Sequence, residues 1–166
     1  MFKVGSGFLK GSEILTNCVG KTKDSGLDFP ILVSMSFAAE VYLKCLLLVC
    51  NKQYPKVHNL KKLFDRLPKP DQTAISDAYE NNFKNSPVFR LLMKPKCIPR
   101  LCSVLSGAGE TFDEMRYSFE RGKKSPVTVG LEEFVEAVQQ RILVTKPELA
   151  EVLDESLIEQ SRRGSK

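Results

Sequence analysis

Apolar residues recur at intervals of three and four along almost the whole chain, whereas the apolar–polar alternation typical of strands is missing. This pattern predicts an all-α domain. A first helix is expected to carry Phe8, Ile14 and Leu15 on its apolar face and to end near Gly20. The polar stretch KTKDSGLD, residues 21–28, follows as a loop.

A second helix is predicted from about Pro30, which is acceptable in a first helical turn, to about Asn51. Between Ile31 and Cys50 its polar side chains are few, namely Ser34, Ser36, Glu40 and Lys44. The last three are spaced by four residues and therefore share one narrow stripe. A helix that is apolar on nearly all other sides is expected to be the central one.

Two shorter helices should follow. Asn59 is a suitable N-cap for a helix whose apolar face holds Leu60, Leu63, Phe64 and Leu67, and the proline-containing LPKP ends it. Residues 71–84 predict the next helix. The passage 85–99 contains three prolines and is expected to be irregular, with some helical turns.

The C-terminal third predicts further helices. Residues 110–122 predict a helix with Phe112, Met115 and Phe119 at helical spacing. Gly122 ends this helix before a basic loop. A helix over 130–144 places Leu131, Phe134, Val135, Val138 and Ile142 on one face.

The expected architecture is thus a bundle of about six or seven helices with an antiparallel core of four or five. Residues 1–146 form this bundle, and residues 147–166 form a C-terminal amphipathic helix and a disordered tail, SRRGSK. The terminal helix could cap the bundle or pack on another subunit.

Composition agrees with one compact domain, because 166 residues of which 42% are hydrophobic suffice for a single core. The longest uncharged apolar run, CLLLVC, is too short to cross a bilayer, and the N-terminus lacks the apolar core of a secretory signal. We therefore expect a cytoplasmic protein without membrane contact. Five cysteines without CxxC spacing and a single histidine predict reduced thiols, no metal site and no cofactor.

Charge is unevenly distributed. Residues 1–70 carry 11 basic and 5 acidic groups, whereas residues 131–166 carry 5 and 8. This polarity permits RNA or an acidic partner without requiring either. A phosphate-binding loop is excluded, because VGKT at 19–22 lacks the glycine that the fingerprint needs at the position of Leu15. No nucleophile elbow is present either.

Three short motifs occur in order along the chain. The first comprises Ala38, Ala39, Glu40, Leu43 and Lys44; the second His58, Asn59 and Leu60; the third Arg116 and Tyr117. In these motifs the chain resembles the HEPN family (higher eukaryotes and prokaryotes nucleotide-binding), whose members are small helical bundles. The resemblance covers roughly half of the chain and implies an HEPN-like fold and a homodimer.

The ribonuclease members of that family carry an arginine four to six residues before a histidine, and two copies meet across a dimer to cleave RNA. Here the required positions hold Asn51, Lys52 and Gln53. Starting from Arg116, the histidine would fall at one of the positions 121–123, which are Arg121, Gly122 and Lys123. The nuclease motif is therefore absent, and the resemblance implies a non-catalytic or diverged member.

Glu40 on an otherwise apolar helix needs a partner, because a buried carboxylate without one is costly. His58, Arg116, Lys44 and Tyr117 are the candidates. One interpretation is a polar cluster that pins the second helix to its neighbours. The other is a groove in which Arg116, Lys44 and His58 bind a nucleotide or an RNA phosphate. Arg121, Lys123 and Lys124 are further candidate phosphate contacts, or a solvated loop.

Three functions follow from these interpretations. The first is a non-catalytic HEPN-like module that binds RNA, a nucleotide or a partner protein, in a setting such as prokaryotic defence or a toxin–antitoxin pair. The second is a metal-independent ribonuclease that uses His58 as an acid–base group, with Arg116 or Lys44 stabilising the phosphorane. The third is a structural adaptor assembled through its C-terminal helix.

Overall fold

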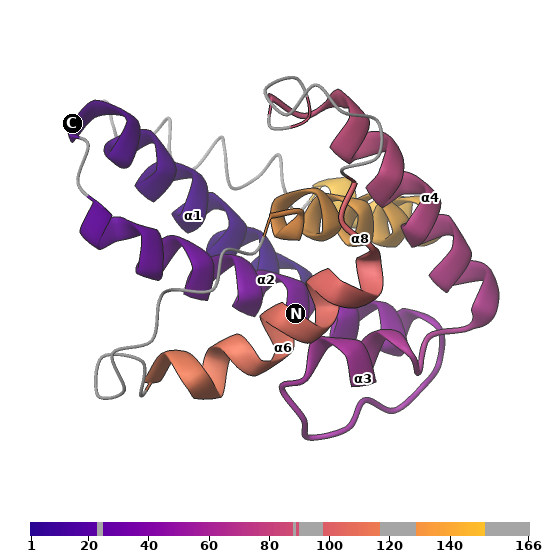
Figure 1. Ribbon diagram of the computed structural model, residues 1–166. Coiled ribbons are helices and arrows are strands. Elements are labelled where there is room, and N and C mark those ends of the chain that lie inside the picture. The colour runs from indigo at the N-terminus through magenta and orange to yellow at the C-terminus, as the bar shows by residue number, and fades with distance from the viewer. Residues whose placement is uncertain (23–24, 88, 90–97, 117–128, 152–166) are drawn as a thin grey trace, which may run out of the picture.

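The computed structural model describes residues 1–22, 25–87, 89, 98–116 and 129–151, and every regular element in those ranges is helical (Figure 1). The prediction of an all-α bundle is confirmed for this part of the chain. The six α-helices are α1 (Phe2–Thr22), α2 (Asp28–Val49), α3 (Leu60–Phe64), α4 (Lys69–Asn85), α6 (Leu101–Arg116) and α8 (Leu131–Thr145). Short 3₁₀ segments are η1 (Ser25–Leu27) and η3 (Pro147–Ala150).

Helix α2 is the centre of the bundle, as its apolar sequence predicts. It packs against α1, α8, α3 and α6, and α8 in turn packs on α4 (Figure 1). Ala38, Ala39, Leu43 and Leu46 have no solvent exposure. The two alanines let neighbouring helices approach closely. The other helices therefore pack around the C-terminal half of α2.

Tyr42 fixes how α1 crosses α2. A Cβ atom on Gly5 would lie 2.7 Å from the Tyr42 ring, so only glycine fits at this crossing. The buried Tyr42 hydroxyl accepts from Gln139 Nε2 at 2.8 Å and shares a hydrogen bond of 2.9 Å with Ser6. Burial raises the pKa of Tyr42. One phenol therefore joins α1, α2 and α8.

By length and composition, α2 could also cross a membrane, since its mean hydropathy reaches 1.8 over an 18-residue window. However, 56% of that window is buried inside the bundle, which is how the core helix of a soluble protein behaves. Glu40 and Lys44 lie within the helix and bind each other. A soluble protein is thus plausible, and a cytoplasmic location stays a prediction.

Helix α3 begins where the sequence indicates. Asn59 is its N-cap, and the side-chain oxygen accepts from the Lys62 backbone N–H at 2.9 Å. The helix ends after one turn at Phe64, and Leu67 is still buried. The prolines after it also start the next helix, because Pro68 is the N-cap of α4 and Pro70 lies in its first turn.

Helix α6 begins earlier than predicted. The sequence pattern placed a helix over 110–122, whereas α6 starts at Leu101 and continues to Arg116. The segment LCSVLSGAG is a weak helix former because of its glycines and serines. Val104, Leu105 and Ala108 are nevertheless buried in the core, so tertiary packing decides its conformation. The predicted inward positions Phe112, Met115 and Phe119 lie outside the described side chains.

Helix α8 confirms the helix expected over 130–144. Its N-cap is Gly130, whose φ of 99° favours glycine. A Cβ atom there would lie 2.6 Å from the hydroxyl of Tyr79, which donates to the Pro99 carbonyl at 2.9 Å. Burial raises the pKa of Tyr79 to about 12. The Tyr79 hydroxyl of α4 thus lies against both Gly130, the N-cap of α8, and Pro99, just before α6.

The segment directly after α8 differs from the prediction. Residues Pro147–Ala150 form a 3₁₀ segment in which Leu149 packs against the core, whereas an α-helix was expected from Pro147. The remaining apolar positions of that expected helix, Val152, Leu153 and Leu157, and the tail after them lie outside the described residues, as does most of the passage 85–99.

Candidate functional site

Glu40, Lys44 and His58 meet at the surface of α2, and we call these three side chains the polar cluster. Glu40 is only 8% exposed. Lys44 lies one turn further along α2, and its Nζ is 2.6 Å from Glu40 Oε1. His58 comes from the loop before α3, and its Nδ1 lies 3.1 and 3.0 Å from the two carboxylate oxygens. The contact expected between Glu40 and His58 is therefore present.

The loop geometry explains how the histidine reaches this carboxylate. His58 immediately precedes the N-cap Asn59, so the capping hydrogen bond that starts α3 also fixes the backbone next to the imidazole. A carboxylate paired with a lysine only accepts hydrogen bonds. His58 Nδ1 therefore carries the hydrogen and donates a hydrogen bond to Glu40. Glu40 thereby sets both the orientation and the tautomer of the ring.

The polar cluster opens to solvent on one side. The side chain of His58 is 57% exposed, whereas those of Glu40 and Lys44 are 10% and 13% exposed. Lys44 Nζ also lies 5.7 Å from the centre of the Tyr54 ring, within the range of a cation–π contact. Tyr54 was not identified as a site residue from the sequence. Its position between Lys52 and Lys56 is the signal that could have found it.

The remaining predicted site residues are not brought into the cluster by any described contact. Arg116 is the last residue of α6, and its side chain lies outside the described part of the structure. Tyr117, Arg121, Lys123 and Lys124 also fall outside it. The place of Tyr117 in the cluster and the phosphate contacts of Arg121, Lys123 and Lys124 stay predictions. Within the described ranges, no group of three or more His, Cys, Asp or Glu side chains could hold a metal ion.

A second polar contact, between Asp71, Arg141 and Cys50, was missed in the sequence. Asp71 is 6% exposed and accepts from Arg141 Nε at 2.7 Å. The thiol of Cys50 donates to the other carboxylate oxygen at 3.6 Å, and burial together with Asp71 raises the pKa of Cys50. Cys50 was expected to be a reduced thiol, and no polar role was predicted for it. It also takes part in a link between the end of α2, the start of α4 and α8.

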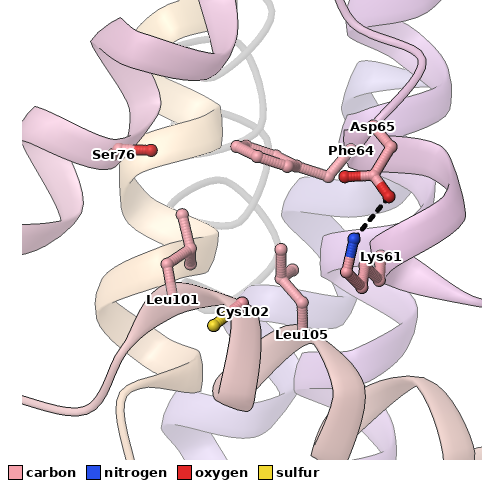
Figure 2. Close-up of a pocket in the computed structure, with 7 residues that line it drawn as sticks. All are labelled: Lys61, Phe64, Asp65, Ser76, Leu101, Cys102 and Leu105. Atoms are coloured by element: carbon pink, nitrogen blue, oxygen red, sulfur yellow. Dashed lines mark hydrogen bonds and ion pairs between the residues drawn. The ribbon is translucent and has the colours of Figure 1, made fainter.

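A small cavity lies between α3, α4 and α6, with a volume of about 220 Å³ (Figure 2). We call it the α3–α6 pocket. Its apolar and thiol lining comprises Phe64, Leu101, Cys102 and Leu105. Its polar lining comprises Lys61, Asp65 and Ser76, and Lys61 and Asp65 form an ion pair of 2.5 Å. The pocket thus combines an apolar floor with a few polar groups, as ligand sites commonly do.

The carboxyl group of Glu136, near the start of α8, has a raised pKa that bears on stability. Desolvation raises the pKa of Glu136, and the neighbouring charges of Glu132, Glu133 and Glu13 raise it further. A raised carboxyl pKa means that protonation favours the folded state, so this contribution is present at low pH and is lost as the pH rises through the folded pKa.

The substitution Glu136→Gln is therefore expected to stabilise the protein slightly at pH 7, by roughly 0.5 kcal/mol or less, because it removes a like-charge pair with Glu132. The gain should shrink as the pH falls towards 4.5, the ordinary pKa of glutamate. Urea unfolding at both pH values measures this difference. A gain that persists undiminished at low pH would contradict the electrostatic cause.

Comparison of the chain with protein-family models, with curated proteins and with solved structures finds no match.

Proposed function

We propose that this protein is a non-catalytic, HEPN-like module that binds RNA along residues 52–69, which we call the basic segment. The basic segment comprises the loop after α2, helix α3 and the turn into α4, and it contains His58 of the polar cluster. It holds six lysines and arginines and one aspartate. The rest of the chain holds 19 basic and 19 acidic residues, so the whole net charge of +5 is concentrated here.

The exposure of these charges supports a role in binding. Lys52, Lys56, Lys62 and Arg66 are all exposed. The side chains of Lys56, Lys62 and Arg66 form no ion pair with any described residue, so their charges are not neutralised within that part of the chain. Exposed cations without an ion-pair partner attract the phosphate backbone of a nucleic acid. This concentration of exposed charge is the observation on which the proposal rests.

The loop is held against the bundle, so the charges have a defined place. Lys52 Nζ donates to the Arg66 carbonyl at 3.0 Å, which joins the start of the loop to the turn after α3. His58 joins the same loop to α2 through Glu40. Tyr54 and His58 add partly exposed rings between the lysines, and aromatic rings in a basic groove are typical of proteins that bind single strands.

The family resemblance supports the same region. Two of its three motifs contribute Glu40, Lys44 and His58, which meet beside the basic segment. The absence of the ribonuclease spacing supports binding without cleavage. A homodimer also stays part of the proposal, from the resemblance alone.

The test is RNA binding by a charge-reversal pair. Lys56→Glu with Lys62→Glu should weaken the binding of a single-stranded RNA by roughly tenfold or more. The slope of log affinity against log salt concentration should fall by the equivalent of about two phosphate contacts. The matched control, Lys3→Glu with Lys84→Glu, changes the net charge equally on exposed lysines of α1 and α4. Fluorescence anisotropy at several salt concentrations measures both. If both double variants lose RNA affinity equally, the basic segment is not a specific binding site. If the unmodified protein binds no RNA, the structural adaptor is favoured instead.

The contact between Glu40 and His58 favours the ribonuclease as the second candidate. A carboxylate that orients an imidazole is also how enzymes prepare a general base. The RNA recovered from the binding experiment distinguishes the two functions. Cleavage that disappears in His58→Ala would establish the ribonuclease, and intact RNA supports the binding module.

A further inference from the structure

The α3–α6 pocket adjoins the basic segment, because Lys61 and Asp65 belong to both. We propose that this pocket receives one base of the bound RNA. This inference rests on the proposed RNA binding and adds the part of the ligand that is recognised. The phosphates would follow Lys56 and Lys62, outside the pocket.

The size and shape of the pocket fit a single flat ring system. Its volume of about 220 Å³ is below the ~300 Å³ at which sites for drug-sized ligands begin. Figure 2 shows the Phe64 ring on one side and Leu101 and Leu105 rising from α6 on the other, with the interior between them. Phe64 and Leu105 are 8% and 2% exposed and Leu101 is half-buried, so a base would meet the exposed edges of these side chains, an apolar contact that does not depend on its identity.

The polar side chains at the edge of the pocket provide both acceptors and a donor for the polar atoms of a base. The Ser76 hydroxyl donates to the Gln72 carbonyl at 2.8 Å, so towards a ligand its oxygen acts as an acceptor. Asp65 is likewise an acceptor, and its pairing with Lys61 positions the carboxylate beside the pocket (Figure 2). Adenine, cytosine and guanine present amino donors, whereas uracil presents a carbonyl in the corresponding place. Lys61 also lines the pocket, and its Nζ is a donor that can bind such a carbonyl, so the lining offers partners to each of the four bases.

Cys102 provides a direct probe of occupancy. Its thiol lines the pocket and is exposed, whereas Cys45 is buried and Cys50 is partly buried. In a protein with Cys18→Ser and Cys97→Ser, a maleimide should react mainly with Cys102. Saturating 5′-CMP or 5′-UMP is expected to slow this labelling several-fold, and ribose 5-phosphate not at all. Equal protection by CMP and by ribose 5-phosphate would overturn the proposal, because no base would then be in the pocket.

A second measurement does not depend on thiol chemistry. Filling the pocket with Cys102→Trp should weaken the binding of a cytosine-containing RNA by roughly tenfold. Ser103→Trp, the matched control, places the same ring on an exposed neighbour of α6 that does not line the pocket, and it should leave affinity unchanged. Unchanged affinity in Cys102→Trp overturns the base pocket, whereas the charge-reversal pair still tests the RNA proposal by itself. If the unmodified protein binds no RNA, both proposals fail.

Discussion

Replacing Glu40 with alanine is expected to lower the free energy of unfolding by about 3 kcal/mol. Lys44 is the reason, since its side chain is only 13% exposed and its ammonium group would lose the carboxylate 2.6 Å away. A buried charge without a partner costs more than the ion pair itself contributes. The imidazole of His58 is 57% exposed and can be hydrated instead, so it adds little to the loss. Urea unfolding followed by far-ultraviolet circular dichroism measures the change.

A double variant separates the lost partner from the lost volume. Glu40→Leu with Lys44→Met removes both charges and keeps apolar bulk on α2, so it should lose less stability than Glu40→Ala alone. If Glu40→Ala instead changes stability by less than about 0.5 kcal/mol, as solvated surface substitutions do, the carboxylate does not hold the loop before α3 to the central helix.

The position of Glu40 could be predicted because its helix is so apolar. An acid on such a helix needs a partner, and two of the four candidates, Lys44 and His58, do contact it. The cap residue Asn59 next to the histidine indicated where that histidine would lie. Local rules of spacing and capping act over a few residues and are visible in the sequence. For the same reason α2, α3 and α8 have the positions that the pattern indicated.

Features that depend on distant residues could not be predicted in this way. The start of α6 has glycines and serines that favour a loop, and only the burial of Val104, Leu105 and Ala108 explains why it is helical. The α3–α6 pocket needs three helices at once. Tyr54 lies in a loop without periodicity, and only the folded structure shows its contact with Lys44 of α2.

The pair Asp71 and Arg141 is the clearest such case, because 70 residues separate the two side chains. Asp71→Ala is expected to destabilise the protein by about 2 kcal/mol. It removes the acceptor of both Arg141 and the Cys50 thiol, and it removes an acidic group from the first turn of α4, where the helix dipole favours one. The loss should be smaller than for Glu40→Ala, because the Arg141 side chain is 27% exposed and can turn towards water.

The matched control lies on the same helix. Asp77 is exposed on α4, so Asp77→Ala makes the identical chemical change without breaking a buried pair and should alter stability by no more than about 0.5 kcal/mol. Combining Asp71→Ala with Arg141→Leu should cost less than the sum of the single changes, because the second change removes the charge left unpaired by the first. Strictly additive losses, or equal effects at Asp71 and Asp77, would mean that α4 and α8 are joined by their apolar contacts alone.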